Sequence, residues 1–310
     1  MNLKTAAKWI GRLLMVAAIA FVLKKIYGYR EDLLPLLNAQ VILVSIGCSI
    51  AYGVVVNLIP FIYQNLLRIT TGKKLPYTKV ELLYCRTNIY KYLPGNVMHY
   101  VGRNQLAMEE NLSHVDVATA TILEIFVTLI SSFVIIVLFS WNYAVEWLSD
   151  NSVSFKLIII AAVACVLVLL VLLLVMRRKL IEVLKKYSLL INKKNIAIYV
   201  GLIFYNVFTM LLTCSLFLLV LRSVGVVLTP SYLLVTIGLF SLSFLLGYIT
   251  PGAPGGIGIR EAMLTYFLGS IADSSLILAG ALIFRIVSIL GDVIAYLIAL
   301  AIVAIGKKNS

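Results

Sequence analysis

Two short segments of this 310-residue chain combine helix-breaking residues with a following arginine. The breakers are Pro94 and Gly95 in the first segment and Pro251, Gly252 and Pro254 in the second. Proline removes a backbone donor and glycine allows angles that a helix does not use, so both segments should leave backbone groups unpaired. Arg103 and Arg260 follow the two breaks, and a guanidinium offers planar donors suited to phosphate or carboxylate. The pattern therefore predicts anion binding beside two interrupted helices.

The second segment is especially rich in glycine and runs directly into a helix that we expect to start at about Ile259. Glycine-rich backbone before a helix presents free N–H groups and the positive end of the helix dipole, which together favour an anion. The residues predicted to bind a phosphate are Arg103, Arg260, Gly255, Gly256 and Gly258.

The elements that carry these segments must lie in a membrane. The chain is 62% hydrophobic and only 13% charged, about half the charged share of a soluble domain. Uncharged runs at 41–67, 195–221 and 223–259 each exceed the ~20 residues that cross a bilayer. A soluble enzyme, a DNA-binding domain and a secreted disulfide scaffold are thereby excluded. The net charge of +13 is assigned to cytoplasmic loops and not to nucleic-acid binding.

The predicted fold is an all-α polytopic membrane protein of about eight transmembrane segments without a soluble domain. Six full spans are expected at 9–27, 41–66, 115–140, 154–176, 196–221 and 274–305, and two interrupted segments at 78–108 and 231–270. The basic loops 67–79 and 177–195 are expected in the cytoplasm, and 141–153 outside. Both termini are then cytoplasmic, in a multi-pass protein of the cell membrane. Segment 78–108 must enter and return as a re-entrant hairpin or an interfacial helix.

The two interrupted segments also point to an internal duplication. An offset of 157 residues places Pro94-Gly95 on Pro251-Gly252, Arg103 on Arg260, Ser113 on Ser270 and Asp116 on Asp273. We expect an inverted-topology repeat of residues 1–153 and 154–310, which in transporters indicates a site near the midplane. The alternative is that 231–249 is an ordinary span and PGAPGG a cytoplasmic turn.

Further ionisable residues should face a cavity or a partner, since a charge at mid-membrane costs ~2.5–3.5 kcal/mol. The supporting or head-group candidates are Arg86, Lys91, His99, Asp116, Glu124, Glu261, Asp273 and Arg285. Of these, Asp116, Glu261 and Asp273 should orient the arginines or contact a cationic head group. The alternative is that such charges neutralise one another between helices, as Glu124 and Arg285 would. Tyr84, Tyr90, Tyr92 and Tyr100 could form an interfacial belt.

At these two segments the chain resembles the lysylphosphatidylglycerol synthase transmembrane (flippase-like) family. The resemblance rests on Tyr92-Leu-Pro-Gly-Asn-Val with Arg103, and above all on Pro251-Gly-Ala-Pro-Gly-Gly-Ile-Gly-Ile-Arg-Glu261. It implies translocation of a lipid between leaflets. Two-part members of the family carry a cytosolic domain that loads lysine onto phosphatidylglycerol. This sequence ends at Ser310 without such a domain, so we expect no synthesis.

The function expected is that of a flippase or scramblase for a phosphate-containing lipid head group. The alternatives are a membrane-embedded enzyme or accessory subunit acting on polyprenyl-phosphate-linked sugars, and a small-solute transporter. The expected partners are membrane lipids, namely anionic or aminoacylated phospholipids or polyprenyl-linked glycolipids. A lipid- or glycan-synthesis enzyme and a second copy of the chain are further candidates. No cofactor, metal or nucleic acid is expected.

Overall fold

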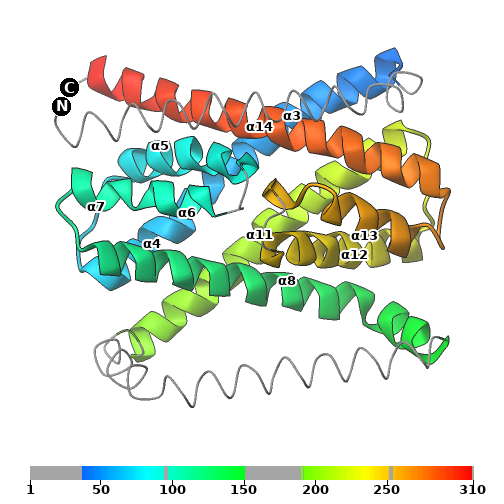
Figure 1. Cartoon of the computed structure of the whole chain (residues 1–310), viewed down its shortest axis with the longest axis horizontal. Helices are drawn as coiled ribbons and strands as arrows, with labels where there is room; N and C mark the ends of the chain where they lie inside the picture. The colour runs from blue at the N-terminus through cyan, green and yellow to red at the C-terminus, as the bar shows by residue number, and fades with distance from the viewer. Residues whose placement is uncertain (1–36, 94–96, 151–189, 191, 251–253, 309–310) are drawn as a thin grey trace.

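The computed structural model describes residues 37–93, 97–150, 190, 192–250 and 254–308, and regular structure in these ranges is entirely helical (Figure 1). The α-helices are α3 Ala39–Leu58, α4 Pro60–Thr71, α5 Tyr77–Asn88, α6 Met98–Arg103, α7 Gln105–Glu109, α8 His114–Asp150, α11 Lys193–Ser223, α12 Pro230–Ile249, α13 Ile259–Leu268 and α14 Ser274–Lys308. Two short 3₁₀ helices, η2 Ile89–Tyr92 and η4 Pro254–Gly256, complete the set in the described ranges.

Five apolar stretches are long enough to cross a membrane: Ala39–Thr71, His114–Trp141, Lys193–Ser223, Pro230–Ile249 and Ser274–Gly306. Large apolar side chains on these helices point away from the protein, with exposed fractions of 73% for Leu43, 67% for Leu138 and 69% for Phe204. Such surfaces suit lipid and not water, so the chain is a multi-pass helical membrane protein. The expected spans 9–27 and 154–176 lie outside the described residues.

The expected span 41–66 is divided at Pro60 into α3 and α4. A proline leaves carbonyls of the preceding turn without their usual N–H donor. Two tyrosine hydroxyls donate to carbonyls at this break: Tyr77 to that of Asn57 at 2.5 Å, and Tyr205 to that of Leu58 at 3.2 Å. Side chains from α5 and α11 thus satisfy an interruption that lies within the apolar stretch.

Two segments expected as loops are largely helical. Helix α4 continues to Thr71, so that only residues 72–76 separate it from α5. Helix α8 continues to Asp150 through most of the stretch 141–153, which was expected to be an external loop. In both places helix geometry continues beyond the apolar run on which the prediction was based.

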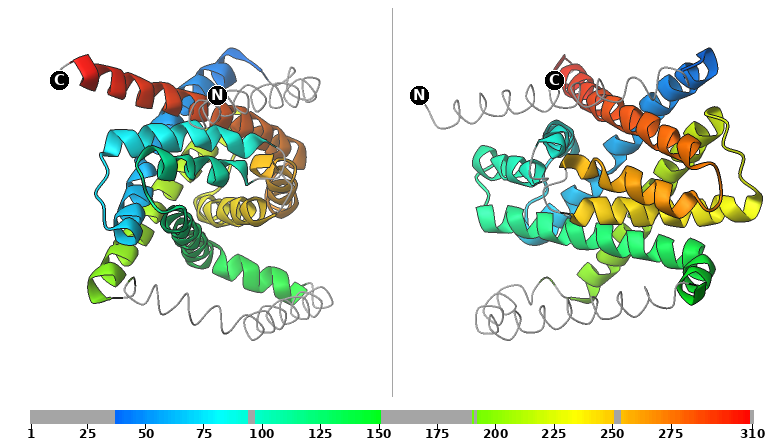
Figure 2. Two further views of the ribbon diagram at one scale, coloured as in Figure 1. Left: turned by 60° about the vertical axis from the view of Figure 1, so that its left-hand side comes forward. Right: turned by 45° about the vertical axis from the view of Figure 1, so that its right-hand side comes forward.

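The two interrupted segments form helical hairpins. The α5–η2 arm lies against α6, and α12 lies against α13 (Figures 1 and 2). We call η2 the tip of the first hairpin and η4 the tip of the second. The two tips contact each other midway along α8. The contact is close, because a Cβ atom added to Gly255 would lie 3.1 Å from the Tyr92 ring. The second tip therefore lies away from the end of the molecule where α4 ends and α11 begins (Figure 1). Helix α12 is itself long and apolar enough to cross a membrane, as the alternative prediction expected of 231–249.

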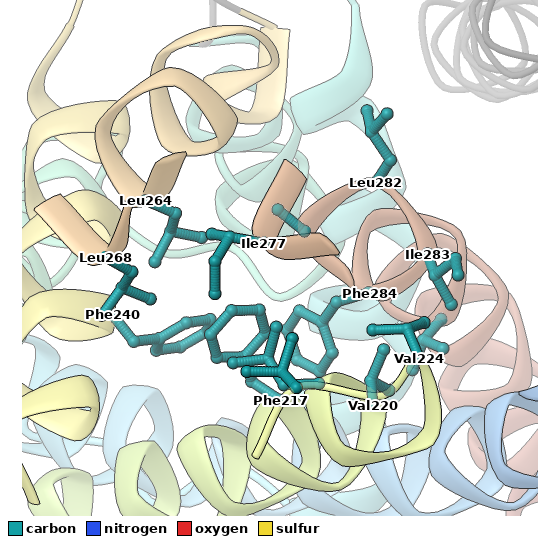
Figure 3. Packing of buried hydrophobic residues seen from close by; sticks show 14 of the residues in the cluster. Phe217, Val220, Val224, Phe240, Leu264, Leu268, Ile277, Leu282, Ile283 and Phe284 are labelled. Carbon is teal, nitrogen blue, oxygen red and sulfur yellow. The ribbon is translucent and has the colours of Figure 1, made fainter. Parts of the chain in front are cut away.

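An aromatic cluster fixes the second hairpin against α11 and α14. The ring centroids of Phe217 and Phe240 lie 4.7 Å apart, and Phe284 meets them edge-on at 5.3 and 5.6 Å (Figure 3). Such pairs contribute about 0.5–1.5 kcal/mol each beyond their buried area. Helix α8 packs across α4, α11 and α12, and α14 packs along α3. These long helices hold both hairpin tips in place.

Candidate functional site

A cavity of about 140 Å³ lies where the hairpin tips meet α8 and α11. Arg103 from the first hairpin and Arg260 from the second both line it, as their shared position after the two breaks predicted. Helix α11 adds uncharged polar side chains to the lining, namely Asn206, Thr209 and Thr213, which follow one face of the helix. With Lys91, which also lines it, the cavity therefore combines three cationic side chains with hydroxyl and amide groups.

Arg103 is neutralised within the protein. It forms an ion pair with Glu124, and the two residues are only 2% and 5% exposed. Its guanidinium carbon also lies 4.0, 5.0 and 5.5 Å from the ring centroids of Tyr84, Tyr63 and Tyr100. The Tyr84 hydroxyl donates to the other Glu124 oxygen at 2.6 Å. A carboxylate and three aromatic faces thus stabilise this buried cation.

These contacts correct two sequence-based interpretations. Glu124 pairs with Arg103 and not with Arg285. Tyr84, Tyr90 and Tyr92 are no interfacial belt, since each is at most 5% exposed.

Arg260 has no such carboxylate. Among the described residues it forms no ion pair, and its buried Nε has no hydrogen-bond partner. The guanidinium carbon stacks over the Phe244 ring at 4.3 Å. The side chain lies tightly against two glycines, because a Cβ atom on Gly247 would lie 2.6 Å from Arg260 Cγ and one on Gly256 2.8 Å from Nε. Arg260 is therefore positioned by shape and stacking, and its charge stays available to the cavity.

The glycine-rich turn is stabilised by an anion of the protein itself. Gly258 N–H donates to Glu261 at 2.7 Å, and Glu261 accepts from Arg285 Nε at 2.9 Å. Arg285 Nη1 also donates to the Gly255 carbonyl at 2.8 Å. Gly255 and Gly258 have φ angles of 57° and 89°, which favour glycine. The anion at the start of α13 is thus the Glu261 side chain, and the Gly258 donor predicted to bind a phosphate is already used.

A third cluster, in which a positive and a negative charge cancel, links the first hairpin tip to α14. Asp292 accepts from Lys91 Nζ at 2.7 Å, from the Tyr92 hydroxyl at 2.5 Å and from Asn88 Nδ2 at 2.8 Å. Lys91 is thus directed toward α14. The signal for this anchor in the sequence is a single acidic residue within the long apolar stretch of α14.

The charges around the cavity sum to one positive charge. Three pairs are neutral: Lys91 with Asp292, Arg103 with Glu124, and Arg285 with Glu261. Arg260 is the remaining cation among the described cavity-lining residues. An unpaired buried charge is unfavourable, so Arg260 is the group around this cavity whose charge lacks a partner among the described residues.

Three predicted supporting residues lie away from this cavity. Arg86 bonds to Gln105 at 2.9 Å and so joins α5 to α7. Asp116 is half-buried in the first turn of α8. Asp273 caps the start of α14, and the hydrogen bond from the Ser275 hydroxyl, together with two backbone N–H groups, lowers the pKa of Asp273.

The remaining predicted residues divide between the cavity and the chain outside the described ranges. His99 lines the cavity, is 6% exposed, and its Nδ1 has no hydrogen-bond partner among the described residues. Pro254 begins η4 at the second tip, next to Gly255 and Gly256. The breakers that lie outside the described residues are Pro94, Gly95, Pro251 and Gly252.

The family model described as the lysylphosphatidylglycerol synthase transmembrane region matches residues 9–295. The chain belongs to this family. The match spans both hairpins and all the charged residues that surround the cavity, and it indicates a membrane function related to lipids. No curated protein matches the chain.

Proposed function

We propose that this protein is a flippase or scramblase that moves a phosphate-containing lipid head group between the leaflets of the cell membrane. The observation that carries the proposal is Arg260, a cation without an acidic partner among the described residues, in a cavity between two hairpin tips. A phosphodiester carries one negative charge and would neutralise this cation. The head group would occupy the cavity while the acyl or prenyl tails stay in the bilayer.

The arrangement of the hairpins supports this proposal. The α5–α7 and α12–α13 hairpins reach the cavity from opposite ends of the molecule (Figure 1). We infer that they are re-entrant from opposite faces, as in an inverted repeat, so that each gates one side of the site. An inside-negative potential would then drive export of an anionic head group by ~2.3 kcal/mol per charge per 100 mV.

The test is head-group translocation in sealed proteoliposomes. The panel contains fluorescent phosphatidylglycerol, its lysyl ester, a polyprenyl-phosphate sugar and phosphatidylcholine. Arg260→Ala should slow movement of the preferred phospholipid about tenfold or more, because a hydrogen bond to a charged group contributes about 1.5–3 kcal/mol. Arg222→Ala removes an exposed arginine at the end of α11 and should leave the rate unchanged.

Wild-type rates in Arg260→Ala would contradict the proposed site. If no lipid moves and the folded protein instead converts a polyprenyl-phosphate sugar to a new lipid product, the protein is an enzyme of that pathway.

A further inference from the structure

Glu124 differs from the other buried acids near the site. Of the described residues it is the only acidic one that lines the central cavity. Asp292 accepts from three side chains, and Glu261 is held by Arg285 and a backbone N–H group. Glu124 is held by Arg103 and by one hydroxyl. It is therefore the acid whose charge an anion entering the cavity would encounter.

The surroundings of Arg103 can hold its charge without an ionised Glu124. Three tyrosine rings surround the guanidinium, and its Nε has no hydrogen-bond partner among the described residues. The Tyr84 hydroxyl, which donates to Glu124 Oε1, can keep donating to the carbonyl oxygen of a neutral carboxylic acid. Both partners of the ion pair thus have alternative interactions in place.

A bound phosphate would favour this change. Its negative charge repels the Glu124 carboxylate in a site of low dielectric constant and attracts Arg103. Protonation of Glu124 would remove the repulsion and release the Arg103 donors.

We propose that Glu124 takes up a proton when the cavity binds a phosphate anion, which frees Arg103 to bind the anion together with Arg260. The proton comes from water and adds to Oε2, the oxygen that faced Arg103, and no bond of the phosphate changes. The titratable groups that face Glu124 are Tyr63 on α4, Tyr84 on α5, Tyr100 and Arg103 on α6, and Tyr248 on α12. His99 on α6 lines the same cavity. Resting on the proposed function, this inference makes lipid transport proton-coupled, with the head group and the proton moving together.

The test is calorimetric titration of dihexanoyl phosphatidylglycerol into the full chain in detergent, in two buffers of different ionisation enthalpy. This phosphodiester does not titrate between about pH 6 and about pH 8, so proton uptake belongs to the protein. We expect about one proton taken up per lipid and a Kd that rises by up to about tenfold per pH unit. Glu124→Gln should bind the lipid without proton uptake, and its Kd should not change with pH. At about pH 8 this Kd should be lower than that of the wild type.

Two controls make the assignment specific. Glu261→Gln alters a buried ion pair outside the central cavity and should keep the pH dependence, and His99→Gln should keep it as well. Loss of proton uptake in His99→Gln but not in Glu124→Gln would overturn the assignment to Glu124.

The outcomes also separate this inference from the proposed function. Arg260-dependent binding with no proton uptake and a constant Kd would overturn the coupling and leave the lipid site intact. Absence of binding by the folded wild type, or wild-type binding by Arg260→Ala, would overturn both. The wild-type proton count decides the question even if Glu124→Gln does not fold.

Discussion

At the scale of single residues, the two cavity arginines differ in what stabilises them. Arg103 is held by a carboxylate and aromatic faces, whereas Arg260 is held by one phenylalanine ring and by close contact with Gly247 and Gly256. A guanidinium restricted by packing keeps its donors for another partner. The absence of side chains at the two glycines is thus as important to the site as the cation itself.

Replacement of Gly247 with alanine should therefore impair function without unfolding the protein. The new Cβ would lie 2.6 Å from Arg260 Cγ, so the arginine must move. We expect head-group translocation in proteoliposomes to slow severalfold. The fold should persist, because alanine is more favourable than glycine within a helix by about 1 kcal/mol of helix-forming free energy.

Gly201→Ala is the matched control, because Gly201 is also helical and nothing lies within 4 Å of its added Cβ. This variant should gain the same helix propensity, and it should transport the lipid at the wild-type rate. Equal rates in the two variants would show that packing against Gly247 does not position Arg260.

At the scale of elements, the positions where helices are interrupted were easier to predict from the sequence than the side chains that pair between helices. Proline and glycine act locally, so both interrupted segments and the start of α13 at Ile259 could be predicted. The break at Pro60 was missed because it lies in an apolar run, and Tyr77 and Tyr205, which satisfy it, are distant in the sequence. The partner of Glu124 could not be predicted, because the hairpin geometry alone brings Arg103 to it.

Buried pairs between elements should contribute far more to stability than an exposed pair of the same chemistry. Asp292 holds Lys91 with its own side chain fully buried, whereas in the Lys79–Glu110 pair the side chains are 57% and 22% exposed. Asp292→Ala leaves a buried ammonium unpaired and should lower the free energy of unfolding by about 3–5 kcal/mol. Glu110→Ala should cost about 1 kcal/mol or less.

Denaturant unfolding in mixed micelles, followed by circular dichroism, measures both values. Similar losses in the two variants would mean that Asp292 does not anchor the first hairpin tip to α14.

At the scale of the whole molecule, charge is unevenly distributed between the two ends. The loop after α4, the start of α11 and the end of α14 lie at one end, and this end carries Lys73, Lys74, Lys193 and Lys194 (Figure 1). The loop between α11 and α12 lies at the other end and contains no basic residue between Ser223 and Pro230. Since basic residues are retained in the cytoplasm, the first end should face inward.

Cysteine labelling would test this orientation on the intact protein. In a Cys165→Ser background, a membrane-impermeant maleimide should label Val227→Cys in intact cells and Lys73→Cys only after lysis. Both positions are exposed, Val227 at 91%, whereas Cys48, Cys85 and Cys214 are buried and should stay unlabelled. Helix α11 separates the two ends, so labelling of both positions from the same side would mean that it does not cross the membrane. The hairpins could then not enter from opposite faces, and the cavity could not be reached alternately from each leaflet.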